Sequence, residues 1–159
     1  MSLATAAVAT HLRLRSDQLI LDLVHGEIRL EVPGREPLVH SFDPFDGTAR
    51  IDFCGGSKRF PTYSFVDVVN DEIIDMEGRP ISGRDAFEGR LVFVGATDVG
   101  LGDFFVTPFT LRLPGVEKHA NVAENLLNGR QLRTHSDEIL VIGVSILVTA
   151  VIVALMTAN

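Results

Sequence analysis

The chain has 159 residues, about the length of one domain, and it is 46% hydrophobic with a net charge of −7. This composition excludes a mainly disordered chain, and an acidic balance without a Lys/Arg cluster argues against nucleic acid as a partner. Cys54 is the single cysteine, so an intrachain disulfide is impossible and a cysteine-based zinc site is disfavoured.

The first predicted elements are a helix and a hairpin. Residues 3–12 are rich in alanine and predict a helix. Apolar residues alternate with others in residues 19–23 and 28–32, which predicts two strands, and residues 25–27 form a plausible tight loop between them. Residues 33–44 hold three prolines and a glycine, which indicates an irregular connection.

A short strand and a short helix are expected next. Residues 50–53 predict the strand, because two glycines follow them at once. Ser64 is placed to cap a helix, with an acidic residue three positions later. Phe65, Val68 and Val69 would form the inward face of that helix.

The third part of the chain predicts a buried strand and a longer helix. Residues 91–94 form a continuous apolar run, which is typical of a strand covered on both faces. Pro114 and Gly115 then open a predicted helix over residues 116–128. The order of strand, helix, buried strand and helix predicts an α/β fold with a partly parallel sheet and packed helices.

The last part of the chain has no charge between residues 139 and 156. As a helix this stretch would be about 27 Å long, close to the hydrocarbon thickness of a bilayer. We therefore expect an extracytoplasmic domain at residues 1–136 and one transmembrane helix at residues 137–159. A buried core helix or two core strands are the alternative.

The loop after the predicted buried strand is the first candidate for a site, because ligands gather at the carboxyl ends of strands in open α/β sheets. Thr97, Asp98 and Asp103 supply its polar groups. A phosphate loop is disfavoured, since Leu and Gly stand where Lys and Ser or Thr are needed. A metal site made of Asp98, Asp103 and His119 is poorly specified, so we predict no metal and no cofactor. The interpretation we favour is that the glycines and aspartates of this loop shape the turn and cap backbone groups.

The helix at residues 116–128 has two distinct faces. Its apolar stripe, expected to face the core, consists of Val116, Ala120, Ala123 and Leu127. Its polar face, expected to meet solvent or a partner, consists of Glu117, Asn121, Glu124 and Asn128. His119 lies at the edge of the stripe, where a histidine is more often a core residue than a ligand. Because no nucleophile stands with a base in a known motif, we predict no catalytic residue in this chain.

Three blocks of sequence follow one another in a distinctive order. They are residues 51–56 with 60–69, residues 87–97 with Gly102, Asp103, Thr107 and Pro108, and residues 113–121 running into 125–127. The run Pro-Gly-Val-Glu-x-His-Ala-Asn at residues 114–121, after a Gly-Ala-Thr loop, is the most specific of them. Over about residues 48–130 the blocks resemble the CHASE-two class of bacterial extracytoplasmic sensor domains. The similarity is to the C-terminal half of that module, with the first membrane helix that follows it.

The resemblance assigns no ligand, but it identifies the positions of this chain that match the motifs of the class. These positions are Thr97, Asp103, Thr107, Pro114, Gly115, Glu117, His119, Ala120 and Asn121. The candidate ligand-binding or structural residues are therefore Thr97, Asp98, Asp103, Thr107, Glu117, His119 and Asn121.

What the resemblance implies is a receptor part rather than an enzyme. The chain would be the sensor of a receptor in a bacterial inner membrane, with the sensor outside the cytoplasm and a bilayer and a cytoplasmic effector as partners. The effector is expected to be an adenylate or guanylate cyclase, with a histidine kinase, a diguanylate cyclase or a Ser/Thr kinase as alternatives. The sensor would take a small-molecule or environmental ligand, and a homodimer is a further expectation. The rival functions are a ligand-free dimerisation module and a stand-alone enzyme.

Overall fold

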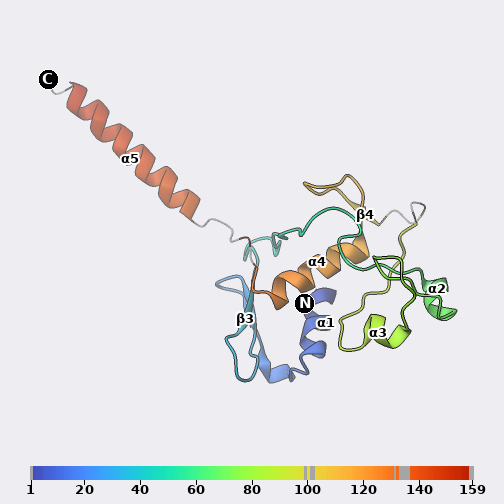
Figure 1. Ribbon diagram of the computed structural model, residues 1–159. Helices are drawn as coiled ribbons and strands as arrows, with labels where there is room; N and C mark the ends of the chain where they lie inside the picture. Colours follow the sequence, from blue (N-terminus) through green and yellow to red (C-terminus); the bar gives the residue numbers. More distant parts are fainter. Residues whose placement is uncertain (1, 99, 101–102, 131, 133–136, 158–159) are drawn as a thin grey trace.

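The computed structural model describes residues 2–98, 100, 103–130, 132 and 137–157, and within its last helix the side chains of residues 142–150, 152 and 153. Figure 1 shows the elements in chain order: α1 (Leu3–His11), the 3₁₀ turn η1 (Ser16–Gln18), β1 (Leu19–Asp22), β2 (Glu27–Leu30), β3 (Leu38–Ser41), α2 (Phe65–Val69), α3 (Gly83–Phe87), β4 (Phe104–Phe105), β5 (Leu113–Pro114), α4 (Gly115–Leu127) and α5 (Asp137–Thr157).

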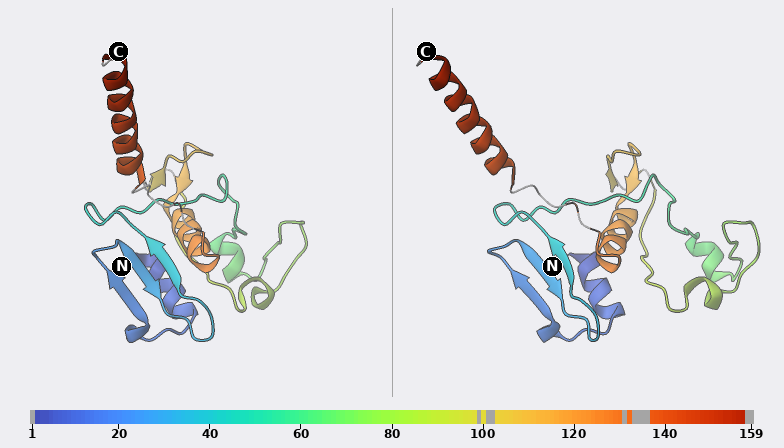
Figure 2. Two further views of the ribbon diagram at one scale, coloured as in Figure 1. Left: turned by 90° about the vertical axis from the view of Figure 1, so that its left-hand side faces the viewer. Right: turned by 60° about the vertical axis from the view of Figure 1, so that its left-hand side comes forward.

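The core lies where α1, α4 and the first sheet meet. The predicted helix at the start of the chain is confirmed as α1, and the Ser2 hydroxyl caps it by accepting a hydrogen bond from the Thr5 amide at 3.2 Å. The two helices pack side by side, and the sheet covers them (Figure 2). The buried apolar residues of this cluster are Ala4, Val8, Ala9, Leu30, Leu38, Val122, Ala123 and Leu126.

The predicted hairpin is confirmed, with β1 and β2 paired antiparallel from Leu19 opposite Leu30 to Asp22 opposite Glu27. Gly26 in its loop has a positive φ of 66°. A side chain at Gly26 would also overlap the Phe42 carbonyl oxygen, and the Phe42 amide donates to the Gly26 carbonyl at 2.7 Å. The loop therefore needs glycine both for its backbone conformation and for a close approach.

The expectation of an irregular connection over residues 33–44 is wrong in part, because β3 lies within it and completes a three-stranded antiparallel sheet. Leu38 and His40 of β3 are buried, whereas Val39 and Ser41 are half-buried. Prolines flank this strand but none lies inside it. The prolines therefore mark where the strand begins and ends, and they do not exclude a strand between them.

The predicted α/β fold with a partly parallel sheet is also wrong. In the described chain both sheets are antiparallel: the order β1-β2-β3, and the two-residue pair of β4 with β5. Residues 50–53 and 91–94 form no strand, although Ile51, Leu91 and Phe93 pack against the core cluster. The apolar run at residues 91–94 coincides with partial burial of alternate side chains, but it does not show that a partner strand is present. Pairing into a sheet depends on a second segment that lies beside the first in register.

The region around α2 and α3 is packed loosely. Ser64 stands at the N-cap of α2 as predicted, but its side chain makes no capping hydrogen bond. The inward face expected for this helix is wrong, since α2 buries none of its residues and Phe65 is 70% exposed. Two residues of this region, Ile73 and Ala86, are buried, and Tyr63 makes an edge-to-face contact with Phe87, with 5.7 Å between the ring centroids.

The charge-free end of the chain forms the 21-residue helix α5, which projects away from the other elements in Figure 1. The expectation of a transmembrane helix at residues 137–159 is not upheld. Among the described residues no helix combines the length and the apolar character that crossing a bilayer requires.

Candidate functional site

Four of the seven predicted site residues, Asp103, Glu117, His119 and Asn121, lie on the first half of α4 or against its start. The start of that helix depends on a close contact. The Gly115 amide donates to the Asp103 carbonyl at 2.9 Å. A side chain at Gly115 would overlap the Asp103 carboxylate, so only glycine lets this carboxylate lie against the first turn of α4. A negative charge is favourable at this end of a helix, where the backbone dipoles leave a positive partial charge.

A second glycine brings the predicted loop against the same helix. A Cβ at Gly95 would lie 2.7 Å from the Val116 Cβ, closer than non-bonded carbon atoms approach one another in proteins. Residues 95 and 103 therefore both lie against the start of α4.

Glu117 is the most buried acidic residue of the site, with 7% of its surface exposed. Its carboxylate accepts a hydrogen bond from the Ser57 hydroxyl at 2.8 Å and one from the Lys58 amide at 2.7 Å. Lys58 adopts a positive φ of 61°, in the turn that follows Gly55 and Gly56. The turn thus presents two donors to one carboxylate, which offsets part of the cost of burying it.

Asn121 lies one turn further along α4 and binds the same segment of chain. Its Oδ1 accepts a hydrogen bond from the Cys54 amide at 2.9 Å, and its Nδ2 donates to the Glu117 carbonyl at 2.8 Å. Asn125 follows after another turn and is 1% exposed. Its Oδ1 is a buried side-chain oxygen without a hydrogen-bond partner among the described residues.

A surface ion pair closes the row of contacts at the far end of α4. The Arg130 guanidinium contacts the Asp52 carboxylate at 2.7 Å and the Cys54 sulfur at 3.7 Å. The hydrogen bond that its guanidinium donates to the Asp52 carboxylate raises the pKa of Arg130. Residues 52–58, here called the strap, therefore run along α4 from its C-terminal end towards its N-terminal end.

The strap corrects one expectation and adds residues that sequence reasoning missed. Glu117 and Asn121 were expected on a face open to solvent or a partner, yet the strap of the same chain covers them. Ser57 and Asn125 were not predicted as site residues. The spacing of Glu117, Asn121 and Asn125 at every fourth residue was the available signal, because it places three polar groups on one helix face.

The remaining predicted residues have separate roles. The His119 ring is half-buried and stacks on Phe93 with 6.5 Å between the ring centroids. Thr107 is buried and closes the turn before β5, where its hydroxyl oxygen accepts from the Thr110 amide at 3.1 Å. Thr97 and Asp98 are exposed, and the Asp98 carboxylate accepts a hydrogen bond from the Gly100 amide at 2.8 Å.

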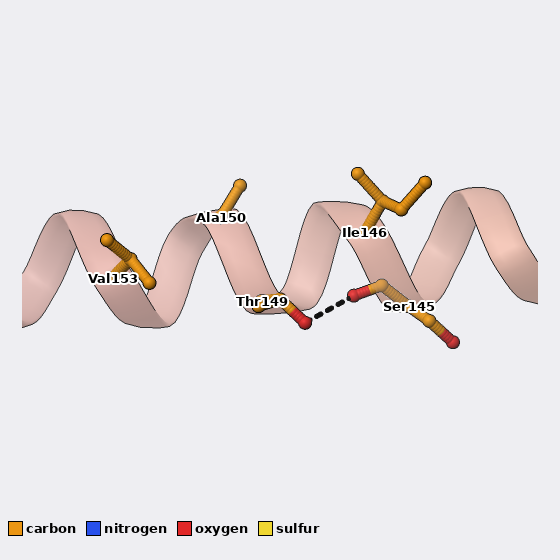
Figure 3. Close-up of a pocket in the computed structure, with 5 residues that line it drawn as sticks. All are labelled: Ser145, Ile146, Thr149, Ala150 and Val153. Atoms are coloured by element: carbon orange, nitrogen blue, oxygen red, sulfur yellow. Dashed lines mark hydrogen bonds between the residues drawn. The ribbon is translucent and has the colours of Figure 1, made fainter.

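The structure thus joins Asp103 to the start of α4 and joins Glu117 to Asn121 through the strap. It does not join them to the side chains of Thr97 or Asp98. The described part of the chain holds no group of three or more His, Cys, Asp or Glu side chains suited to a metal ion. One surface hollow of the described chain lies along α5, where it is lined by Ser145, Ile146, Thr149, Ala150 and Val153 (Figure 3).

The comparison with protein families bears directly on this arrangement. The model of the CHASE2 domain family matches residues 1–156, which is nearly the whole chain. The chain belongs to the CHASE2 family. The resemblance inferred from the motifs is therefore confirmed, and the match extends beyond residues 48–130 at both ends. Neither the search of curated proteins nor that of solved structures returned a match.

Membership of the CHASE2 family states what kind of part this chain is. CHASE2 domains are extracytoplasmic sensor domains of membrane signalling receptors, and they are not catalytic. Several of the motif residues have structural roles in this CHASE2 chain. Gly95, Asp103 and Gly115 set the start of α4, and Glu117 and Asn121 hold the strap.

Proposed function

We propose that this chain is the extracytoplasmic sensor of a receptor in a bacterial inner membrane, and that the receptor controls a cytoplasmic adenylate or guanylate cyclase in the same parent polypeptide. The observation that carries the proposal is the CHASE2 match over residues 1–156. The sensor takes a small-molecule or environmental ligand, and the exposed loop at residues 95–98 is the surface we assign to it. The exposure of Thr97 and Asp98 supports this assignment.

The contacts of α4 support a route by which a change in the loop at residues 95–98 could reach the rest of the protein. A loop that changes on ligand binding acts on the rest of a protein only through elements in contact with it. Residues 95 and 103 contact the start of α4, and the strap contacts the same helix at Glu117 and Asn121, and Arg130 beyond its end. We therefore propose α4 as the element through which the loop acts.

The extracytoplasmic location is tested by chemical labelling of intact cells. Phe45 is 98% exposed, so Phe45→Cys in a Cys54→Ser background gives one accessible thiol. A membrane-impermeant maleimide should label this receptor in intact cells or spheroplasts. Val8→Cys in the same background is the matched control, because Val8 is fully buried and its thiol should react only after unfolding. Labelling of Phe45→Cys only after the cells are broken would contradict the location.

The output is tested by cyclic-nucleotide formation. The gene for the parent receptor is expressed in a bacterium whose own adenylate cyclase is deleted, and cyclic AMP and cyclic GMP are measured. One of them should accumulate, whereas the 159-residue chain expressed alone should produce neither. Transfer of phosphate from ATP to a histidine of the receptor, without a cyclic nucleotide, would replace the cyclase by a kinase.

A further inference from the structure

Residues 91–94 combine two properties that are rarely left together on a protein surface. Their side chains alternate, with Leu91 and Phe93 packed against the core cluster while Val92 and Val94 are 49% and 81% exposed. This two-residue period is the pattern of a strand with one face on the core. Three of the four residues are β-branched or aromatic, and such residues favour extended structure.

The backbone of the same residues is unpaired. Within the described chain, the N–H and C=O groups of residues 91–94 make no hydrogen bond with other backbone groups or with side chains. The neighbouring contacts hold the segment in place, since Phe93 stacks on His119 and Gly95 abuts Val116. Residues 91–95 are therefore held beside α4 without a strand partner, and the backbone donors and acceptors of residues 91–94 are available to pair with another chain.

We propose that residues 91–94 bind an extended strand of a partner polypeptide through backbone pairing. The unpaired N–H and C=O groups call for another backbone, which a lipid or an apolar small molecule does not supply. The exposed Val92 and Val94 call for apolar side chains at every second residue of that strand. Addition of a strand to an exposed edge is a common mode of peptide recognition, in which the main chain supplies affinity and alternate side chains supply selectivity.

A second copy of this chain is a poorer occupant than a flexible partner strand. Stable interfaces between folded proteins bury about 1,200 Å² or more, and four paired residues bury far less. A flexible strand can follow the edge without bringing two folded bodies into contact. This inference is independent of the cyclase output proposed above, because it concerns only what residues 91–94 bind.

The test uses the full 159-residue chain and a nine-residue synthetic peptide of alternating Val and Thr with a Lys at each end. Hydrogen exchange of the amides of residues 91–95 is followed by mass spectrometry or NMR as peptide is added. The amides should exchange more slowly with the peptide bound, and amides in the β4–β5 turn should not change. A peptide of the same sequence with every amide N-methylated should not bind, because it keeps the side chains but has no donors.

Two variants distinguish peptide binding at residues 91–94 from non-specific binding of the peptide elsewhere on the chain. Val94→Pro removes an N–H that has no partner within the described chain, so the fold should survive while peptide affinity falls about tenfold. Val106→Pro is the matched control, because Val106 is 74% exposed in another loop, and it should bind like the parent chain.

The proposal is overturned if exchange at residues 91–95 does not slow at any peptide concentration, or if the N-methylated peptide binds equally well. It is also overturned if these amides become protected by self-association of the chain without peptide, which would make a second copy the occupant.

Discussion

The region built from α1, the first sheet and α4 holds most of the buried apolar side chains, whereas the described part of residues 60–112 buries only the apolar residues Ile73 and Ala86 and leaves about half of its apolar side chains exposed. In the first region Ala4, Val8, Leu30 and Leu126 are at most 1% exposed. In the second the large exposed apolar residues are Phe65, Val66, Val69, Ile74, Met76, Val92, Val94, Val106, Phe109 and Leu111. The two regions belong to one chain and one family match, so composition alone does not separate them.

The difference shows where stability resides and where partners have room to bind. Folding is favoured by apolar area removed from water, so most of that contribution comes from the first region. Exposed apolar residues that lie close together are typical of surfaces that meet other molecules. The candidate site lies between the two regions, because α4 belongs to the first and the loop at residues 95–103 to the second.

The largest expected effect comes from truncating the core. Leu126→Ala should lower the free energy of unfolding by about 2–5 kcal/mol, because it leaves a cavity where Leu126 is 1% exposed. Leu111→Ala is the same substitution at a residue that is 78% exposed, and it should change stability by less than about 0.5 kcal/mol. Urea unfolding of both variants measures the contrast. Equal losses would show that residues 60–112 bury Leu111 in solution.

The next effect tests the junction of the two regions. Gly115→Ala should destabilise the chain by about 1–3 kcal/mol, because its methyl group would overlap the Asp103 carboxylate. Gly143→Ala is the control, since nothing lies within 4 Å of that position in α5, and it should be neutral or slightly stabilising. The double variant Gly115→Ala with Asp103→Gly should recover part of the loss. If it recovers none, Asp103 does not lie against α4.

A pH-dependent effect is expected inside the first region. Burial lowers the pKa of His40 below its ordinary value of 6.5, so the folded state favours the neutral ring. The stability this contributes is complete above about pH 6.5 and is lost as the pH falls towards the lowered pKa.

The variant His40→Leu should therefore lose less stability than the parent chain between pH 7 and pH 5. The difference is bounded by about 1.4 kcal/mol per pH unit for one proton, and thermal unfolding across the pH series measures it. His11→Gln, at an exposed position, is measured alongside as the control for removing a histidine. A His40→Leu slope equal to that of the parent would show that His40 is not buried in solution.

The smallest effect separates structural from sensing roles at the site. Asp103→Asn keeps the shape of the side chain but removes the charge at the start of α4, so stability should fall by about 0.5–1 kcal/mol. Asp98→Asn is the control, because Asp98 is exposed and its amide variant can still accept from Gly100. Should Asp103→Asn keep full stability yet abolish the response of the parent receptor, Asp103 would be a sensing residue rather than a structural one.

Much of this architecture was readable from local patterns. The helix that became α4 was predicted over residues 116–128 from its apolar spacing and its flanking Pro and Gly, and the structure forms Gly115–Leu127. The β1–β2 hairpin followed from alternation on either side of a tight loop. The motif order also led to the CHASE2 family. Such features depend on residues close together in sequence, so a single chain reveals them.

Only the tertiary structure decided which faces are covered and by what. The polar face of α4 resembled a solvent face, but the strap, some sixty residues earlier in the chain, turns back onto Glu117 and Asn121. Residues 91–94 resembled a doubly covered strand, yet one face and both backbone edges are open. Periodicity shows that two faces differ, but burial depends on which distant segment folds against each face. Hydrogen bonds and packing between residues far apart in sequence make that choice.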